Sequence, residues 1–294
     1  MELYEKIRKE WLEGDLNRDK DLVDPPEVKR YNDIPYGPVE KWNLLDLYVP
    51  KDDARSPLPV IVSIHGGGYV YGTKEIYQHY GMNLAKGGFA FINFNYRLAP
   101  ESPFPAALED CVKVMTWLYE NAGKYDLDTE NVFMVGDSAG AHYTSLYLCA
   151  YCNPSYADLI GIKSEKRVKI KACALNCGVY DPLKLRFEDG LDDFVTYLMG
   201  DDWREKSDKY LCAHNYLTKD YPPVYLMSGL NDYLLHQFEP MKKRIDEFGI
   251  ELRSKVYGDE EPDKAYHVFH VDMNNRFQKE CNDNELLFFK EHIK

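Results

Sequence analysis

The five residues at 136–140, Gly-Asp-Ser-Ala-Gly, place a serine between two glycines. The apolar run before them is typical of a strand, and the residues after Ser138 are typical of a helix. At such a strand-to-helix turn the serine hydroxyl projects above the sheet, and the amides of the helix N-terminus face a reacting carbonyl. The pattern therefore predicts that Ser138 is the nucleophile of an acyl-transfer reaction. An ordinary glycine turn is the alternative.

A second glycine-rich stretch, His-Gly-Gly-Gly at 65–68, follows an apolar, β-branched run. An acyl-transfer enzyme needs N–H groups aimed at the carbonyl oxygen that becomes an oxyanion, and consecutive glycines let the backbone turn them there. A flexible turn or a phosphate loop is the alternative, but the chain has neither of the common phosphate-binding glycine motifs. We expect the amides of Gly66, Gly67 and Ala139 to form the oxyanion hole, and His65 to brace the loop by hydrogen bonding.

A third stretch completes a recognisable set of motifs. It reads Tyr-Arg-Leu-Ala-Pro-Glu at 96–101 and Phe-Pro-Ala-Ala at 104–107. Together with the two glycine motifs, in this order and at these separations, it resembles the hormone-sensitive lipase family of α/β-hydrolases, which includes bacterial class IV esterases. The resemblance covers roughly residues 40–290 and implies ester hydrolysis by a serine nucleophile, with no organic cofactor and no metal. Arg97 and Glu101 are expected to brace loops below the site.

The base that activates the serine is expected downstream, because in this fold the groups follow the order serine, acid, histidine. Six of the eight histidines follow Ser138. One of these lies in the presumed terminal helix and one in the presumed cap. His267 stands where the resembling family has His-x-Phe, so the resemblance implies that His267 is the base. His270 is the rival, and its alternative role is structural.

The acid that orients the base is expected after the apolar strand at 224–228. The resembling family has an Asp there, commonly followed by Pro-Leu, and this chain has Asp232 followed by Tyr-Leu. Tyr233 is thus a departure from the family pattern, and a helix N-cap is the alternative role for Asp232. With this acid in place, Ser138 would attack the ester while His267 takes its proton, and water would then release the acyl-enzyme.

The elements that must position these groups alternate between strands and helices along the chain. Such alternation predicts an α/β fold with a mostly parallel sheet and helices on both faces, and the resemblance specifies the α/β-hydrolase fold. The spacing predicts strands at 44–49, 59–64, 89–95, 131–135, 168–175, 224–228 and 252–257, and helices at 75–86, 106–120, 138–151, 238–248 and 274–291.

We expect a single domain over residues 1–294, with two additions to the regular pattern. Residues 1–38 are interpreted as a short, mobile N-terminal arm that begins with a helical face. The aromatic and charged segment at about 183–221 is interpreted as a small cap over the edge of the sheet. Tyr69 and Tyr71 follow the oxyanion loop and are expected to line the substrate pocket.

The bulk composition argues against several classes of function. The net charge of −13 opposes sequence-independent binding to nucleic acid or to anionic membranes. No apolar run is long enough for a transmembrane helix or placed as a signal peptide. Seven scattered cysteines are typical of reduced thiols, so we expect a cytoplasmic protein in which Cys149 and Cys152 are buried free thiols. A homodimer through an exposed edge strand is a further hypothesis.

The expected partner is a small-molecule ester, but its identity is less constrained than the reaction class. We expect short-acyl esters, including acetyl groups on sugars, because the cap has no long apolar helix suited to a lipid interface. The 24 tyrosines leave aromatic acyl groups such as feruloyl open. An amidase of the same fold, such as an arylformamidase, is the main alternative, which the third glycine at 65–68 and the stretch at 97–101 disfavour. A non-catalytic binding homologue is disfavoured because Ser138, Asp232 and His267 are all present.

Overall fold

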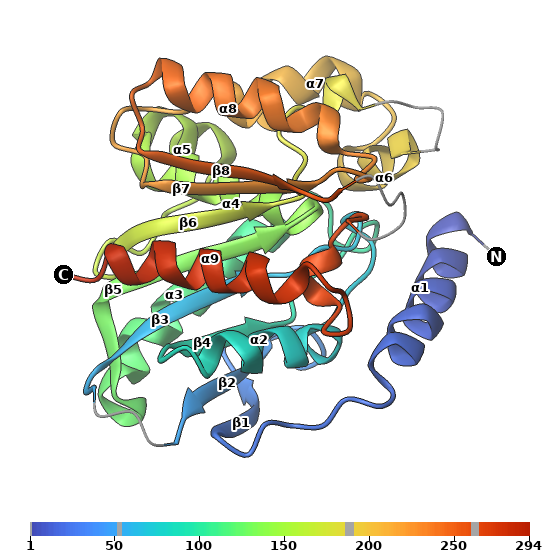
Figure 1. Ribbon diagram of the computed structural model, residues 1–294. Helices are drawn as coiled ribbons and strands as arrows, with labels where there is room; N and C mark the ends of the chain where they lie inside the picture. Colours follow the sequence, from blue (N-terminus) through green and yellow to red (C-terminus); the bar gives the residue numbers. More distant parts are fainter. Residues whose placement is uncertain (1, 52–54, 186–190, 260–264) are drawn as a thin grey trace.

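The computed structural model has one eight-stranded sheet through its centre (Figure 1). It describes residues 2–51, 55–185, 191–259 and 265–294. The strands are β1 (Val28–Pro35), β2 (Leu44–Pro50), β3 (Leu58–Ile64), β4 (Ala90–Phe94), β5 (Leu127–Asp137), β6 (Ile170–Asn176), β7 (Val224–Gly229) and β8 (Leu252–Tyr257). Their spatial order is β1-β2-β4-β3-β5-β6-β7-β8. β2 is antiparallel to both of its neighbours, and all other neighbouring strands run parallel.

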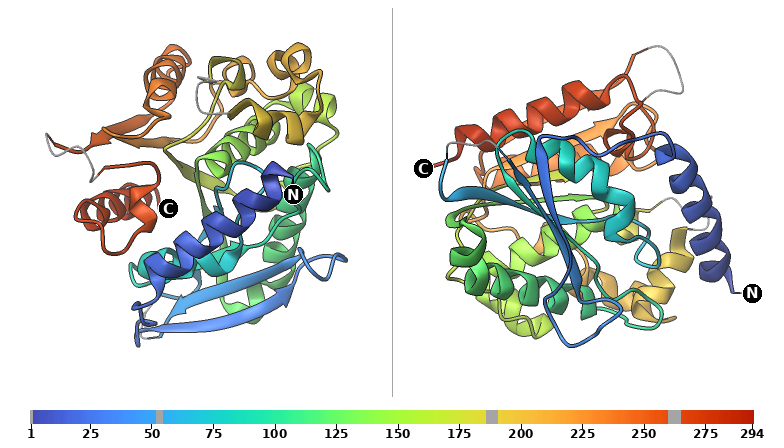
Figure 2. Two further views of the ribbon diagram at one scale, coloured as in Figure 1. Left: turned by 90° about the vertical axis from the view of Figure 1, so that its right-hand side faces the viewer. Right: turned by 90° about the horizontal axis from the view of Figure 1, so that it is seen from below.

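Helices cover both faces of this sheet. The α-helices are α1 (Leu3–Asp19), α2 (Gln78–Ala85), α3 (Ala106–Tyr125), α4 (Ala139–Cys152), α5 (Pro154–Ile160), α6 (Leu191–Met199), α7 (Trp203–Tyr210), α8 (Phe238–Glu247) and α9 (Gln278–Glu291). α2 and α9 lie on one face, and α3 and α4 lie on the other (Figure 2). Short 3₁₀ turns are η1 (Lys74–Tyr77), η2 (Pro182–Lys184), η4 (Ala213–Asn215), η5 (Leu235–Gln237) and η6 (Phe269–Val271). This is the α/β-hydrolase architecture that the sequence predicts.

The predicted elements of the central sheet are present because strands covered on both faces leave continuous apolar runs. All residues of β3 and β4 are buried. Several element boundaries differ from the prediction by a few residues, and two of the differences are informative. β5 begins at Leu127, which pairs with Leu58 just before a register shift. Polar residues follow Leu127, so this first part of the strand has no apolar run that would reveal it in the sequence. The predicted helix at 75–86 is the 3₁₀ turn η1 followed by α2.

The predicted N-terminal arm at 1–38 contains two regular elements. α1 is a helix of 17 residues, and β1 pairs with β2 as an edge strand of the sheet. No strict alternation marks β1 in the sequence, because it is half-exposed and its register shifts between Tyr31 and Ile34. In Figure 1, α1 lies beside the ends of the parallel strands, which is the position of a wall rather than of a free arm.

The predicted cap at about 183–221 lies between β6 and β7 and contains α6, α7 and η4. Residues 186–190 of this segment lie outside the described residues. α6 is joined to the loop before α3, where the N–H of Phe104 donates to the carbonyl of Leu198 at 3.0 Å. Trp203 is fully buried, so this cap aromatic belongs to the core. Phe194 lines a cavity described below.

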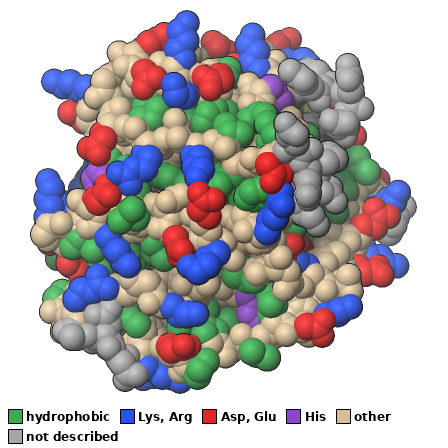
Figure 3. All heavy atoms as spheres, in the orientation of Figure 1, with side chains coloured by type: hydrophobic (Ala, Val, Ile, Leu, Met, Phe, Trp, Pro, Cys, Tyr) green, Lys and Arg blue, Asp and Glu red, His purple; other side chains and the backbone are tan. Residues whose placement is uncertain are grey.

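Charged side chains of both signs lie side by side on the face of the molecule in Figure 3, over α8 and α9. None of the described helices is both long and apolar enough to cross a membrane. All seven cysteines are free, as the sequence predicts. In α4, Cys149 is buried and Cys152 is half-buried.

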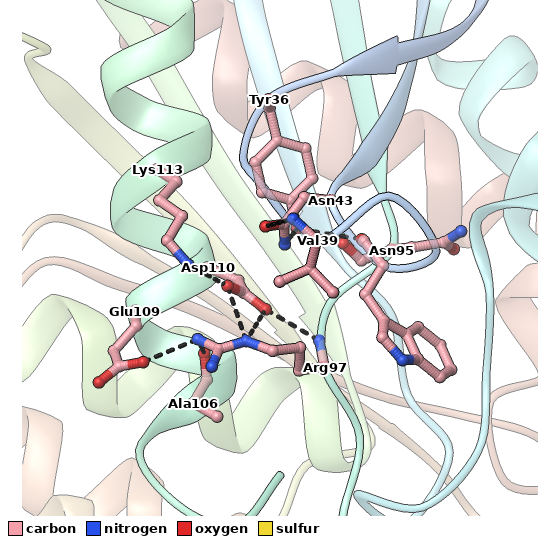
Figure 4. Close-up of polar contacts among 10 residues, drawn as sticks. Tyr36, Val39, Asn43, Asn95, Arg97, Ala106, Glu109, Asp110 and Lys113 are labelled. Carbon is pink, nitrogen blue, oxygen red and sulfur yellow. Dashed lines mark hydrogen bonds and ion pairs between the residues drawn. The ribbon is translucent and has the colours of Figure 1, made fainter. Parts of the chain in front are cut away.

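Arg97 and the buried Asp110 connect the end of β4 to α3 (Figure 4). The Nε of Arg97 donates to Asp110 at 2.9 Å, and its Nη2 donates to the carbonyl of Ala106 at 3.0 Å. Lys113 adds a second cation 2.7 Å from the same carboxylate. Glu101, the other residue expected to brace loops, pairs instead with Arg8 of α1 at 2.6 Å. The third motif thus supports the start of α3 and the position of α1.

Candidate active site

The turn between β5 and α4 holds Ser138 in a strained backbone conformation. Its φ of 52° and ψ of −121° are unusual for a residue with a side chain. The N–H of Ser138 donates to the carbonyl of Asn176 on β6 at 3.0 Å, which fixes the turn to the sheet. A Cβ at Gly140 would lie 2.0 Å from the carbonyl oxygen of Ile64, so only glycine fits there. This is the sharp strand-to-helix turn that the pentapeptide predicts.

Three side chains from distant parts of the sequence meet at this turn. The Nε2 of His267 lies 2.9 Å from the Oγ of Ser138, and its Nδ1 lies 2.8 Å from the Oδ1 of Asp232. In the neutral imidazole, the Nδ1–H donates to Asp232 and Nε2 accepts the serine hydroxyl. The structure therefore brings together the predicted nucleophile, base and acid in an arrangement that can transfer the serine proton.

Asp232 is buried among hydrogen-bond donors that favour its ionised form. Its Oδ2 accepts the hydroxyl of Ser228 at 2.9 Å, and its Oδ1 accepts the N–H of Leu234 at 2.8 Å. Burial acts to raise the pKa of Asp232, but the charge and hydrogen bond of His267 and the Leu234 amide outweigh it and hold the pKa below its usual value. Asp232 therefore caps the local turn and accepts the hydrogen bond of His267 at the same time.

Two further residues border His267. The ring of Tyr233, the residue that replaces the usual proline, lies 4.3 Å from the imidazole, measured between ring centroids. Val268 has a φ of 54°, a strained value for a β-branched residue. Strained residues thus lie at Ser138 and beside His267, where side-chain direction matters most.

His270, the rival base, is not in contact with the serine. It is fully buried, and neither of its ring nitrogens has a hydrogen-bond partner among the described residues. Burial lowers the pKa of His270 to about 3. Its ring packs edge-on against Tyr80, with 5.3 Å between centroids, so the structure places His270 in the core.

The His-Gly-Gly-Gly loop at 65–68 leaves the end of β3 and borders the same cavity as Ser138. Gly67 has a φ of 124°, and a Cβ there would lie 2.0 Å from the carbonyl oxygen of Tyr71. Only glycine can adopt this conformation in this space. The loop thus needs glycine at position 67 for the backbone course that it takes beside the cavity.

His65 braces this loop, as the sequence predicts. Its Nδ1–H donates to the carbonyl of Gly66 at 2.7 Å. Its ring stacks on Tyr96, with 4.2 Å between centroids. Burial lowers the pKa of His65 to about 4, so the imidazole is neutral at physiological pH.

The amide of Gly66 already has an acceptor, which differs from its expected role in the oxyanion hole. Its N–H donates to the hydroxyl of Tyr77 at 3.0 Å, and that hydroxyl donates to Asp137 at 2.6 Å. Burial raises the pKa of Asp137 to about 6, although the Tyr77 hydrogen bond opposes this rise. Within the described residues, no acceptor takes the N–H of Gly67, Gly68 or Ala139.

A cavity of about 420 Å³ opens above Ser138. Tyr69 and Tyr71, which the sequence predicts as pocket residues, both line it. Their hydroxyls point to structural partners: Tyr69 bonds to the Nδ1 of His142 at 2.8 Å, and Tyr71 donates to Asp15 at 2.6 Å. The two rings therefore contribute apolar surface, while their polar ends hold neighbouring elements.

Sequence reasoning missed that α1 forms one wall of this cavity. Trp11, Asp15 and Arg18 of α1 line it. The ring of Trp11 lies 5.6 Å from Tyr71 and 5.7 Å from Phe194 of α6, between centroids. The helical face at 3–12 was visible in the sequence, but only the fold shows which surface it covers.

A second cavity, of about 390 Å³, also borders α1. It shares Gly14, Asp15, Arg18 and Val268 with the cavity above Ser138. Its other walls are mostly polar and come from Asn17, Asp272 and Asn274, together with the partly exposed ring of Tyr266. An apolar and a polar space thus adjoin each other near the serine.

Within the described residues, two groups of side chains could hold a metal ion. One consists of Cys177, Asp232 and His267. Here Asp232 and His267 are hydrogen-bonded to each other and His267 to Ser138, so this group already has partners. The other group lies at the base of the cap and is considered below.

The sequence matches the BD-FAE family model over residues 45–240. The acetyl esterase of Salmonella dublin is 27% identical over 234 residues, which cover 76% of this chain and 68% of that protein. A probable carboxylic ester hydrolase of Mycobacterium tuberculosis, LipM, is 27% identical over 212 residues, which cover 69% of this chain and 48% of that protein.

Solved structures show the same similarity over nearly the whole chain. Esterase B of Lactobacillus rhamnosis has a TM-score of 0.89 at 26% identity, over 97% of this chain and 93% of that one. A bacterial heroin esterase, at 19% identity, shares the fold with a TM-score of 0.78 over 98% and 91% of the two chains. The chain is therefore a carboxylic ester hydrolase of the BD-FAE family, with the α/β-hydrolase fold and the hormone-sensitive lipase-like motifs that its sequence predicts.

Proposed function

We propose that the protein hydrolyses small, short-acyl carboxylic esters through an acyl-enzyme on Ser138. The observation that carries the proposal is the hydrogen-bonded series from Ser138 through His267 to Asp232, at 2.9 and 2.8 Å, beside a cavity of about 420 Å³. A serine hydroxyl is a weak nucleophile, and a neutral imidazole at hydrogen-bond distance is the group that activates it.

In the proposed mechanism, the Oγ of Ser138 attacks the ester carbonyl as its proton moves to the Nε2 of His267. Asp232 holds the Nδ1–H and stabilises the imidazolium that forms. His267 then gives the proton to the leaving alcohol. A water molecule, deprotonated by His267, attacks the acyl-enzyme and releases the carboxylic acid.

For the oxyanion hole we propose the amides of Gly67, Gly68 and Ala139. The N–H of Gly66 is taken by Tyr77, whereas these three N–H groups have no acceptor in the described part of the chain. Ala139 also begins α4, whose N-terminus carries positive partial charge. Each such donor is worth about 3 kcal/mol to the transition state.

The two cavities support a preference for a short acyl group on a polar alcohol. Trp11, Tyr71 and Phe194 form aromatic pairs that limit the apolar space above Ser138. The adjoining cavity offers carboxylate and amide side chains, which suit hydroxyl-rich alcohols such as sugars. The acetyl esterase among the relatives supports the same choice.

An ester panel tests this proposal. We expect kcat/KM to be highest for p-nitrophenyl esters with about two to four acyl carbons and to fall toward twelve, because longer chains must displace the aromatic wall. Acetylated xylan and methyl ferulate extend the panel to sugar-borne acetyl and aromatic acyl groups. Maximal kcat/KM on acyl chains of eight carbons or more, or on methyl ferulate, would contradict the short-acyl proposal.

N-formylkynurenine distinguishes an ester hydrolase from an amidase of the same fold. We expect its kcat/KM to be far below that of p-nitrophenyl acetate. The opposite order would assign the site to arylformamidase chemistry.

For partners, we propose that the protein acts on a small molecule and binds neither nucleic acid nor membranes. The net charge of −13 and the mixed charges on the face in Figure 3 support this. Location in the cytoplasm and a homodimer through the half-exposed edge strand β8 are parts of the same proposal. Sedimentation of the purified protein, at concentrations above and below those used in assays, tests the dimer.

A further inference from the structure

Three side chains with metal-binding atoms meet at the base of the cap, outside the ester site. Asp181 lies in the loop after β6, and Cys212 and His214 lie where the chain returns from α7 toward β7. The ligand atoms of the three side chains all lie within 4.8 Å of one another. Thiolate, imidazole and carboxylate are together a ligand set typical of Zn²⁺.

The two segments that supply these side chains are already fixed to each other. The N–H of Ala213, between the two cap ligands, donates to the carbonyl of Tyr180 at 3.1 Å. On the other side, the side chain of Gln237 accepts the N–H groups of Tyr180 and Asp181 at 3.2 and 3.1 Å. These hydrogen bonds join the two segments without a metal, so the backbone that carries the three side chains is already in place.

His214 supplies a second, independent observation. Its Nε2 is buried and has no hydrogen-bond partner among the described residues. A buried polar atom without a partner is unfavourable and is a common sign of a bound ion or water. Cys212 is buried, whereas Asp181 and His214 are half-buried, so a metal ion would lie close to the surface with its thiolate ligand shielded from solvent.

From this geometry we propose that Asp181, Cys212 and His214 bind one Zn²⁺ ion, with a water molecule as the fourth ligand. Tetrahedral zinc holds such ligand atoms about 3.5 Å apart, so small side-chain rotations close the remaining distance. The Cys212 thiol loses its proton to solvent on binding, and its sulfur becomes the ligand. Zn²⁺ then joins the loop after β6 to the end of the cap.

The charges around the site are compatible with a cation. Asp181 and Asp208 act on Cys212 as negative charges. The guanidinium of Arg244 opposes a cation, since its Nε donates to the carbonyl of His214 at 2.9 Å. That guanidinium also pairs with Glu247 at 2.8 Å. One carboxylate and one thiolate in the ligand set therefore leave the site favourable for a divalent ion.

The proposal does not depend on ester hydrolysis, and its test does not use activity. Purified protein, treated with a chelator and kept reduced, is titrated with Co²⁺, whose thiolate complexes have a charge-transfer band in the near ultraviolet. We expect this band to saturate at one equivalent, together with the visible bands of tetrahedral Co²⁺. Zn²⁺ should then remove the bands by competition, and it should raise the Tm of the apoprotein.

Variants assign the site. Cys212→Ser should abolish the band, and His214→Gln and Asp181→Asn should weaken Co²⁺ binding at least about tenfold. Cys152→Ser, which changes a half-buried thiol on α4, should bind as the unaltered chain does. The Tm and far-UV circular dichroism of each metal-free variant show whether it is folded, and the two non-cysteine variants decide the matter if Cys212→Ser is not.

Three results would overturn the proposal. The first is the absence of a charge-transfer band in the unaltered protein. The second is a band that persists in folded Cys212→Ser or is unaffected by His214→Gln and Asp181→Asn. The third is a band lost in Cys177→Ser instead, which would place the metal beside Asp232 and His267.

Discussion

The loops that carry Ser138, Asp232 and His267 and the helix α1 both border the cavity, but they are held in different ways. Ser138 and Asp232 are buried and joined by hydrogen bonds to neighbouring strands or turns. In α1 only Ile7 is buried, and the helix is held by the ring of Trp11 and by polar contacts such as those of Arg8 with Glu101 and with the carbonyl of Ala99.

This difference suggests that the two regions control different kinetic properties. The reacting groups depend on buried backbone geometry that cannot shift without unfolding, which keeps distances near 3 Å constant. The wall that meets the substrate rests on a helix with few buried contacts, where side chains can change at little cost in stability. Substitutions of Ser138, Asp232 or His267 should therefore alter kcat, and substitutions on α1 should alter substrate preference.

The largest effect is expected at His267. His267→Ala removes the base between Ser138 and Asp232 and should lower kcat on p-nitrophenyl acetate by at least about 10,000-fold with little change in Tm. His270→Phe is the matched control, because the buried His270 ring has no hydrogen-bond partner in the described part of the chain, and it should keep activity within about threefold. Comparable losses in both variants would contradict the assignment of the base.

A smaller loss is expected when the hydroxyl that joins Gly66 to Asp137 is removed. Tyr77→Phe removes the hydroxyl that accepts the Gly66 N–H and donates to the buried Asp137 carboxylate. The lost hydrogen bonds stabilise the position of the loop by about 1–2 kcal/mol. Their loss should lower kcat by about tenfold, while KM changes little.

Tyr80→Phe is the control for this prediction. It removes another buried tyrosine hydroxyl that donates to a buried carboxylate, that of Glu285, outside the cavity walls. Both variants should lose stability, but only Tyr77→Phe should lose kcat. Equal kcat values in the two would show that the Gly66 contact has no role in positioning.

On α1, the expected effect is on specificity. Trp11→Ala removes the ring that contacts Tyr71 and Phe194 and should change kcat/KM for longer acyl chains severalfold more than for acetyl. Leu12→Ala is matched in exposure, since Leu12 is 41% and Trp11 is 39% exposed, and it lies outside the cavity. Identical acyl-chain profiles for the two variants would remove α1 from the substrate pocket.

The smallest effect concerns stability rather than rate, at Glu285 beneath the strand ends. Burial raises the pKa of Glu285 to about 7, although hydrogen bonds from Asn176 and Tyr80 oppose this. The folded state therefore binds a proton that the unfolded state has lost between about pH 4.5 and 7, so this group lowers stability as pH rises through that window. The full effect is at most about 3 kcal/mol.

Glu285→Gln cannot ionise, so its Tm should fall less than that of the unaltered protein between pH 5 and pH 8. Thermal melts at both pH values measure the difference. Equal falls in Tm would mean that Glu285 titrates normally in the folded protein.

The sheet and the reacting residues could be predicted because local sequence determines them. Gly136 and Gly140 are required by close backbone approaches around Ser138, and the order of serine, acid and histidine follows from the order of the strands. A choice between His267 and His270 needed the resemblance, since both follow the same strand. Only the structure shows that His270 is turned into the core.

The pocket could not be predicted in the same way. α1 has a recognisable helical face, but the sequence does not show which surface this face contacts. Trp11 of α1 packs against Phe194 of α6, and strands β1 to β6 lie between them in the sequence. The oxyanion loop shows the same limit on a smaller scale. Three adjacent glycines are equivalent in the sequence, and only the hydroxyl of Tyr77, which comes from η1, sets Gly66 apart.

The most direct test is the reaction of the protein with a fluorophosphonate probe, followed by intact-mass analysis and peptide mapping. A serine activated by His267 and Asp232 should take up one equivalent, located on Ser138, and Ser138→Ala should take up none. A folded, monodisperse sample that stays unlabelled, or a label carried by another residue in both proteins, would contradict the assignment of Ser138 as the nucleophile.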